Sequence, residues 1–371
     1  MIYFDNSATT CPSKSCIEAI NTELLLFANP SSVHTAGWEA RKRLEQSRAA
    51  IGKTLGVSPD QVIFTASATE SDNMALIGAA NAKKRRGKTV LITDSEHPAI
   101  SQSAAKLESD GFKVLKIPTK GGVLDLDAIK AACQSKDVIV SSFMHVNNET
   151  GAVYDVKSAN SLVKSLCPEA ICHCDCVQSY LKYPVSLQAL CADMISISAH
   201  KVSGPKGIAA LIIKKGVRII PVIFGGGQEN ALRSGTENTP AIAGFAAAAR
   251  EGFENMEENK AFVSSLKETI LSAFSKDQRI AFNCPPNQSP WIISMQVKGF
   301  KSEVLLRILS DKGIFVSAGS ACSSKNKKSP ILKAFGLSDA EADCTIRVSL
   351  SHSNTKEDCL EFIKTIKEIL K

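Results

Sequence analysis

Residues 194–207, which read MISISAHKVSGPKG, are the first place to look for a functional site. Its first five residues form a β-rich run, and Ser198, His200 and Lys201 follow before a loop rich in glycine and proline. In open α/β sheets, ligands bind beyond the carboxyl ends of the strands. The polar residues at the end of this run are therefore candidates for a functional site, and the ends of the other predicted strands are the next places to search.

Further β-rich runs alternate with helix-like stretches between about residue 60 and residue 213. Such alternation predicts an α/β fold with a large, doubly wound and mainly parallel sheet. The predicted strands lie at residues 62–64, 90–92, 114–117, 138–140, 171–175 and 194–198.

The pattern changes near residue 240 to a long helical stretch, which predicts a domain boundary near residue 255. We expect a large domain over residues 14–255 and a smaller α+β domain made of residues 1–13 and 256–371. The chain should close with a helix behind a Thr355-x-x-Asp358 cap. The apolar face expected for this helix consists of Leu360, Ile363, Ile366 and Leu370.

The run at residues 62–64 leads into small and hydroxyl residues, Thr65-Ala66-Ser67-Ala68-Thr69, before a helical pattern begins. Small side chains let backbone amides approach a ligand, and a helix N-terminus attracts phosphate. The same residues also fit an ordinary capping box, Ser67-x-x-Glu70. Both interpretations stay open on this segment alone.

Three cysteines, Cys172, Cys174 and Cys176, alternate along the run at residues 171–175 and just beyond it. On a strand such residues share one face at steps of about 6.6 Å, which is too far apart for three thiolates to bind one ion through bonds of about 2.3 Å. We therefore expect them to pack in the core, and we predict no metal site. His173 and Asp175 lie on the opposite face, with Asp175 at the carboxyl end.

Lys201 alone fits an exposed loop lysine as well as a reactive one. An acid at the end of one strand, a lysine after the next and an anion site upstream are together what pyridoxal phosphate (PLP) requires. This combination favours a PLP enzyme over a loop of no special function.

Composition indicates a folded protein without an export signal. The 371 residues include 44% hydrophobic residues and carry a net charge of +7. No run of about 18 uncharged apolar residues predicts a membrane span. Twelve cysteines without a leader favour a reducing, cytoplasmic location. The basic run at residues 83–86 fits a solvated helix end, so we predict no nucleic-acid partner.

Ordered motifs along nearly the whole chain resemble the cysteine desulfurases of the iron–sulfur cluster assembly type. These enzymes form a branch of the class V aminotransferase-like, fold-type I PLP enzymes. The matching segments are residues 4–10 (FDNSATT), 29–34 (NPSSVH), 68–73 (ATESDN), 96–97 (EH), 145–151 (HVNNETG), 198–201 (SAHK), 225–229 (GGGQE), 233–236 (RSGT), 317–322 (SAGSAC) and 347–349 (RVS).

The resemblance implies a role for each residue around the cofactor ring. Lys201 would be the Schiff-base lysine, Asp175 the partner of the pyridinium nitrogen and Gln178 the donor to the ring oxygen, while His97 would stack on the ring. The phosphate would be held by Ala68, Thr69, Ser198, His200 and, from the other subunit of a homodimer with a shared active site, Thr236.

Asn148, next to the cofactor, and Arg347 would bind the carboxylate of L-cysteine. Cys322 would take the sulfur as a persulfide, with His97 as the nearest acceptor for its proton. Sulfur would then pass to an acceptor protein, such as an iron–sulfur scaffold or a tRNA thiolation factor. Two features depart from the family pattern, namely the cysteines on both sides of Asp175 and Ala209 in place of a glycine.

Three alternatives to a cysteine desulfurase remain. A selenocysteine lyase or another class V aminotransferase-like enzyme would share the fold, although an aminotransferase needs no nucleophile at Cys322. A cysteine-rich metal or redox carrier would bind no PLP and would be colourless when purified.

Overall fold

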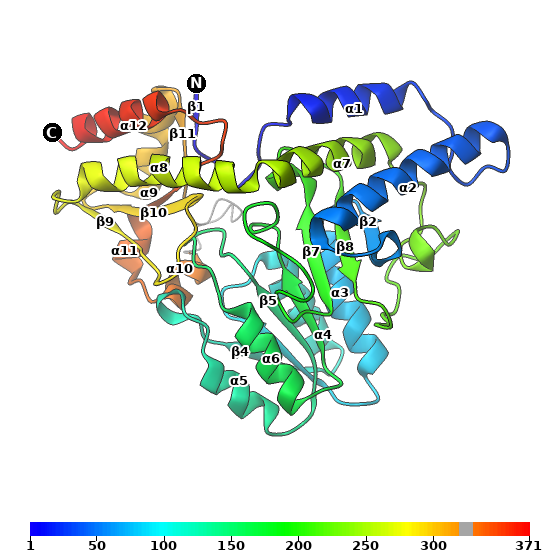
Figure 1. Ribbon diagram of the computed structural model, residues 1–371. Helices are drawn as coiled ribbons and strands as arrows, with labels where there is room; N and C mark the ends of the chain where they lie inside the picture. Colours follow the sequence, from blue (N-terminus) through cyan, green and yellow to red (C-terminus); the bar gives the residue numbers. More distant parts are fainter. Residues whose placement is uncertain (319–328) are drawn as a thin grey trace.

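A seven-stranded sheet forms the centre of the larger part of the molecule in the computed structural model, which describes residues 1–318 and 329–371 (Figure 1). Its strand order is β2-β8-β7-β6-β5-β3-β4. Only β8 runs antiparallel to its neighbours, so the predicted mainly parallel sheet is confirmed. The strands are β2 (Val62–Thr65), β3 (Thr89–Thr93), β4 (Lys113–Ile117), β5 (Val138–Met144), β6 (Ile171–Asp175), β7 (Met194–Ser198) and β8 (Ala209–Ile213).

Helices cover both faces of this sheet, as a doubly wound fold requires. One core contains apolar residues of α2, α5, α6 and α7, whereas the core on the other face contains those of α3 and α4. Neighbouring strand residues point into different cores, for example Ile63 and Phe64. The helices of this part are α1 (Lys14–Leu24), α2 (Thr35–Leu55), α3 (Ala68–Lys83), α4 (Pro98–Ser109), α5 (Leu126–Cys133), α6 (Val156–Leu166) and α7 (Thr239–Glu254), with short 3-10 turns η1 (Pro59–Gln61), η2 (Lys120–Gly122), η3 (Ala199–Lys201) and η4 (Glu229–Ala231).

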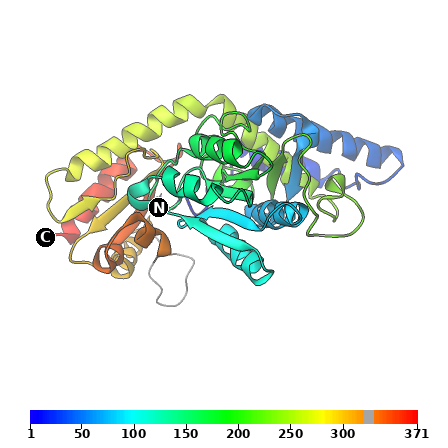
Figure 2. The same cartoon turned by 90° about the horizontal axis from the view of Figure 1, so that it is seen from below.

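A four-stranded sheet of order β12-β13-β10-β9 organises the smaller part, seen beside the large sheet in Figure 2. Helices α8, α9 and α12 pack with it around a third core, and β1 pairs in parallel with β11. The elements are β1 (Ile2–Tyr3), α8 (Met256–Phe274), β9 (Ile280–Phe282), β10 (Ile292–Val297), α9 (Ser302–Asp311), β11 (Ile314–Phe315), β12 (Ser317–Ala318), α10 (Pro330–Phe335), α11 (Asp339–Asp343), β13 (Thr345–Ser349) and α12 (Lys356–Ile369).

The last helix confirms its predicted cap and three of the four residues of its predicted apolar face, since Ile363, Ile366 and Leu370 are buried. Thr355 caps α12 and forms a capping box with Asp358. Leu360, expected on the apolar face, is 50% exposed, while Phe362 is fully buried. Phe362 lies next to Ile363 and takes the core position, where its ring buries a large apolar surface.

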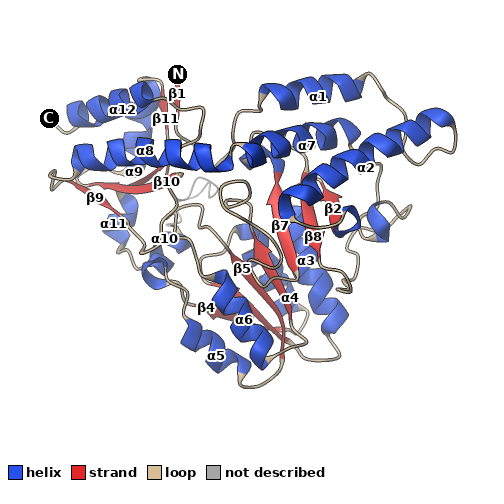
Figure 3. Cartoon of the chain, viewed as in Figure 1, coloured by secondary structure: helices blue, strands red, loops and turns tan. Residues whose placement is uncertain are grey.

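Helices α7 and α8 follow each other along the top of the molecule and join its two parts (Figures 1 and 3). Asn255 ends α7 and precedes α8. The division of the chain at residues 14 and 255 stays a prediction. In the described part of the chain, no helix is both long and apolar enough to cross a bilayer.

A buried ion pair fastens the segment after β8 to the first strand of the sheet. The Arg48 guanidinium donates to both carboxylate oxygens of Glu229, at 2.6 and 2.8 Å, and the backbone amide of Phe64 donates to the same carboxylate at 2.8 Å. The two side chains are only 8% and 2% exposed. Glu229, Asn230 and Ala231 all have positive φ values, a conformation that needs such an anchor.

We predict that Arg48→Met lowers the free energy of unfolding by about 3–5 kcal/mol, because it leaves the Glu229 charge buried without its partner. Urea denaturation followed by circular dichroism measures the loss. Lys106→Met is the control, since it removes the exposed i,i+4 pair with Asp110 and should change stability by less than about 1 kcal/mol. Equal losses in the two variants would contradict the anchoring role of Arg48.

Candidate active site

Two neighbouring parallel strands carry the candidate residues to one edge of the large sheet. Strand β6 ends at Asp175, and β7 ends at Ser198, which leads directly into the turn η3 with Lys201 at its end. Asp175 pairs with Ser196 across the two strands. The Lys201 ammonium donates to the carbonyl oxygens of Ser7 and Ala8, at 2.5 and 2.7 Å. The predicted acid and lysine therefore lie at the same edge, with the N-terminal segment beside them.

Asp175 is a buried carboxylate that favours a cationic partner. Burial raises its pKa, while the Val177 amide, which donates to Oδ1 at 2.9 Å, and the nearby His97 and Lys201 act in the opposite direction. A protonated ring nitrogen placed here would stabilise the ionised carboxylate. This environment fits the pyridinium partner that PLP needs.

His97 caps the N-terminus of α4, just beyond the end of β3. Its Nδ1 accepts a hydrogen bond from the amide of Ala99 at 3.1 Å. Burial lowers the pKa of His97, the Asp175 carboxylate acts in the opposite direction, and Lys201 contributes a smaller lowering. The neutral imidazole therefore carries its proton on Nε2, so this nitrogen is a donor.

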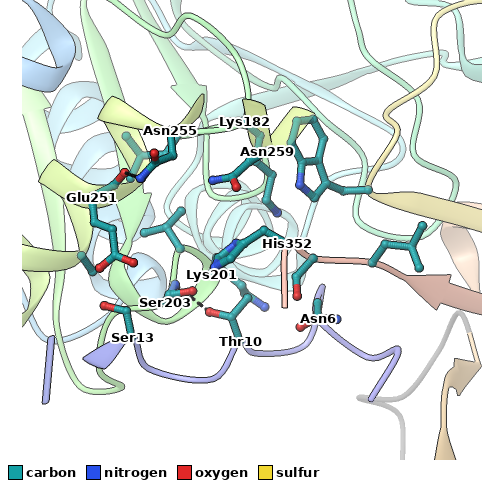
Figure 4. Close-up of a pocket in the computed structure, with 17 residues that line it drawn as sticks. Asn6, Thr10, Ser13, Lys182, Lys201, Ser203, Glu251, Asn255, Asn259 and His352 are labelled. Carbon is teal, nitrogen blue, oxygen red and sulfur yellow. Dashed lines mark hydrogen bonds between the residues drawn. The ribbon is translucent and has the colours of Figure 1, made fainter. Parts of the chain in front are cut away.

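Gln178 and a second lysine join the same polar network. Gln178 Nε2 donates to the carbonyl of Ser7 at 2.9 Å, and Lys182 Nζ lies 3.5 Å from Gln178 Oε1. Burial, and secondarily the charge of Lys201, lower the pKa of Lys182 to about 7. Figure 4 shows both lysines on the walls of one cavity of about 100 Å³, together with Asn6.

The start of α3 offers a cradle for an anion. Ser67 caps the helix through the Glu70 amide, and the Ser71 amide bonds to the carbonyl of Ser67. The amides of Ala68 and Thr69 come before the residues that make these bonds. They lie at the N-terminus of the helix, which carries a partial positive charge. Glu70 does not close the capping box, since its carboxylate accepts from the Ala66 amide instead. The segment therefore has a cap and still fits a phosphate.

The remaining predicted phosphate ligands lie at different places. Ser198 is buried at the end of β7. The His200 ring contacts Thr9 Oγ1 at 3.2 Å, and burial, with the charge of Lys201, lowers the pKa of His200 to about 4. Thr236 is exposed and lines a separate cavity with Thr65 and Ala66. Within one chain, Thr236 does not line the cavity that contains Lys201.

Arg347, on β13, is buried and only partly satisfied. Its Nη1 donates to the carbonyl of Asn148 at 3.0 Å, and its Nη2 donates to Asp5 Oδ1 at 2.7 Å. Arg347 Nε and Asn148 Oδ1 are buried without a hydrogen-bond partner. A buried donor without a partner is costly, so this site fits a small anion such as a carboxylate.

Cys322 lies outside the described residues. The residues on either side of that segment are both near the Arg347 site. Ser317 of β12 pairs directly with Arg347 across the small sheet. Ser329 Oγ donates to Glu149, the residue after Asn148, and burial raises the pKa of Glu149 to about 7.

The three alternating cysteines lie in the buried core with α6 and α7. Their sulfur atoms come closer than the strand spacing suggests, since Cys174 and Cys176 have sulfurs 3.5 Å apart. Across residues 1–318 and 329–371, no group of three or more His, Cys, Asp and Glu side chains is arranged to hold a metal ion.

Sequence reasoning missed three contributors to this edge, namely Asp5, the carbonyl of Ser7 and Lys182. Asp5 and Ser7 were within a recognised motif, but nothing local indicates what they contact. Lys182 follows Gln178 by four residues. In a helical turn this spacing indicates contact between the two side chains, but the sequence did not predict a helical turn here.

Comparisons with known proteins agree with this geometry. Residues 2–362 match the family described as aminotransferase class-V. The chain is 35% identical over 374 residues to cysteine desulfurase IscS 1 of Archaeoglobus fulgidus, covering 100% of this chain and 97% of that one. A solved NifS-like protein superposes with a TM-score of 0.94 at 35% identity, covering 100% and 99% of the two chains. A structure titled SspA in complex with cysteine gives 0.83 at 30% identity, covering 96% and 100%.

These relatives share the fold-type I architecture and the dependence on PLP. The chain belongs to the class V aminotransferase family.

Proposed function

We propose that the protein is a PLP-dependent cysteine desulfurase, which converts L-cysteine to L-alanine and transfers the sulfur to Cys322. The observation that carries this proposal is the open, buried Nε–H of Arg347 in a chain that also places Lys201 and Asp175 at one sheet edge. The full-length likeness to a protein named cysteine desulfurase, and to one solved with cysteine, supports the choice of substrate.

PLP bound at this edge would supply an electrophilic carbonyl carbon and a ring that accepts electrons. Lys201 would attach it, and Asp175 would keep its ring nitrogen protonated. Gln178 has a second amide proton for the ring oxygen, and His97 would lie against the ring. The phosphate would be bound by Ala68, Thr69, Ser198, His200 and the Thr236 of a partner subunit.

Arg347 would bind the substrate carboxylate through Nε and a remaining Nη proton, with the Asn148 side chain beside it. A guanidinium suits this task because its planar donors match two carboxylate oxygens. Binding the carboxylate at a fixed place orients the Cα–H bond and the thiol of the substrate relative to Lys201.

Lys201 would carry the proton between steps at its Nζ. The carbonyls of Ser7 and Ala8 accept hydrogen bonds from this nitrogen and hold it at the sheet edge. A lysine amine placed there can take a proton in one step and return it in the next. His97 can donate from Nε2, and it could accept a proton only at Nδ1 by giving up the bond to Ala99. Its predicted role as acceptor for the Cys322 proton stays a prediction with that restriction.

The proposal includes a homodimer with a shared active site, a cytoplasmic location and an acceptor protein for the sulfur, either an iron–sulfur scaffold or a tRNA thiolation factor. It also includes a large domain over residues 14–255 and a smaller one of residues 1–13 and 256–371. The three separate cores support this division. The buried residues of the third core are Phe4 and residues after 262, and Val146 is the one that comes from the proposed large domain.

Purified, PLP-loaded protein should form L-alanine and sulfide in equal amounts from L-cysteine with a reductant present. Amino-acid analysis and a sulfide assay measure both products. A protein that acts on L-selenocysteine and leaves L-cysteine unchanged would be a selenocysteine lyase instead. Formation of a keto acid with no sulfide, in an assay that also supplies a second keto acid as amino-group acceptor, would indicate an aminotransferase.

Lys201→Ala should lose at least about a thousandfold in alanine formation, because it removes the amine that follows β7 at the same sheet edge as Asp175 and that we propose as both the attachment point and the base. The variant should unfold at the wild-type temperature without cofactor. Lys206→Ala, an exposed lysine in the same loop, is the control and should keep its activity. Comparable losses in the two variants would argue against the assignment of Lys201.

Cys322→Ser should bind PLP and L-cysteine with wild-type affinity but release no sulfide, because a hydroxyl cannot take the sulfur. In the wild type, mass spectrometry of peptides after a brief exposure to L-cysteine should find one added sulfur atom at Cys322. Cys11→Ser, which removes an exposed thiol, is the control. Sulfur found at Cys174 or Cys176 would refute the role of Cys322.

A further inference from the structure

We propose that Asp5 is the positioning residue that orients Arg347 for the substrate carboxylate. The proposal rests on the assignment of Arg347 as the carboxylate-binding residue. It adds a second group, far away in the sequence, on which substrate affinity depends.

The contact between the two side chains is short and shielded from solvent. Arg347 Nη2 lies 2.7 Å from Asp5 Oδ1, and the two side chains are 6% and 23% exposed. Asp5 forms a parallel bridge with Ser349, which lies on the same face of β13 as Arg347. The backbone arrangement itself therefore brings the carboxylate to the guanidinium.

Two nitrogens of the guanidinium are fixed and the third is left open. Nη1 is held by the carbonyl of Asn148, Nη2 is held by Asp5, and Nε is buried without a partner. Two contacts on a planar group fix both its position and its plane. An incoming carboxylate then meets donors that already point in the right direction, so binding does not require ordering a flexible side chain.

A counter-charge is also needed at this depth. A buried guanidinium without an anionic partner has a large desolvation penalty in the substrate-free protein. The Asp5 carboxylate supplies the partner through a single oxygen contact and leaves Nε uncovered. If Asp5 competed with the substrate for Arg347, its carboxylate would be expected to cover Nε, the donor that the substrate uses.

The backbone around Asp5 is held firmly enough to support this role. Its carbonyl accepts from the Ala8 amide at 2.9 Å, and the Ser7 amide donates to Ser349 Oγ at 2.9 Å. The Asn6 side chain donates to the carbonyl of Ser349, also at 2.9 Å. The turn that begins at Asp5 then provides the two carbonyls that accept from Lys201.

The test compares Asp5→Ala and Asp5→Asn with the wild type, each loaded with PLP. Calorimetry gives the dissociation constant of L-alanine, and steady-state assays give KM and kcat for L-cysteine. Asp5→Ala should weaken L-alanine binding and raise KM by about 10- to 100-fold, in line with loss of a hydrogen bond between charged groups, with a smaller change in kcat. Asp5→Asn should lose clearly less than Asp5→Ala, because its amide oxygen still accepts from Nη2 although the counter-charge is gone.

Two further variants separate positioning from a general loss of structure. In an Arg347→Lys background, Asp5→Ala should have little additional effect on L-alanine binding, because both changes disable one unit. Glu23→Ala removes the carboxylate of another shielded arginine pair, at 2.9 Å from Arg43, and should leave L-alanine binding unchanged.

Unchanged or tighter L-alanine binding in Asp5→Ala would overturn the proposal, and so would effects of Asp5→Ala and Arg347→Lys that simply add. If the wild type formed no alanine from L-cysteine, the proposed function would fail. The L-alanine affinities of these variants, together with Arg347→Lys alone to complete the cycle, would still decide whether Asp5 orients Arg347.

Discussion

The parallel pairing of β6 with β7 is the constraint on which the site depends. Parallel strands end at the same edge, so Asp175 and the turn that carries Lys201 come together without any specific contact between their side chains. Burial of this edge raises the pKa of Asp175 and lowers that of Lys182. One topological choice therefore supplies both the placement of the groups and the low-dielectric surroundings that alter their protonation.

The N-terminal turn links this edge to the smaller sheet. Asp5 contacts Arg347 on one side, and the carbonyls of Ser7 and Ala8 accept from Lys201 on the other. A shift of the small sheet relative to the large one would move this turn as well. Substrate binding at Arg347 and proton transfer at Lys201 are thus mechanically connected through four residues, which explains why a short terminal segment can matter for chemistry.

Local sequence patterns predict most of the fold and, at the candidate site, only Asp175, Lys201 and the start of α3, while the other proposed roles rest on the family resemblance. The strands that end at Asp175 and Ser198 were predicted at their observed bounds, because β-rich runs end there in polar residues. Strand β8 was missed, because its apolar residues follow the loop after Lys201 without the alternation with helices that marks the other strands. The face of α12 differs from its prediction at Leu360, since periodicity alone does not tell whether Leu360 or the adjacent Cys359 faces the core.

Asp5 was missed because it acts through a distant contact. Asp5 and Arg347 are 342 positions apart, and only the assembled sheets bring them together. Lys182 was missed for a different reason, since its contact with Gln178 spans only four residues and depends on the local turn. The tautomer of His97 also depends on local structure, through its position as the cap of α4.

The identity of the lysine that binds the cofactor tests the central claim most directly. Lys182 is the relevant rival, because it is buried close to Lys201 in the same network and its pKa of about 7 makes its amine reactive. PLP-loaded protein would be reduced with borohydride, digested between the two lysines and mapped by mass spectrometry. We predict that the reduced cofactor is found on the peptide that contains Lys201. Cofactor found on Lys182, with Lys201 unmodified, would contradict the proposed site.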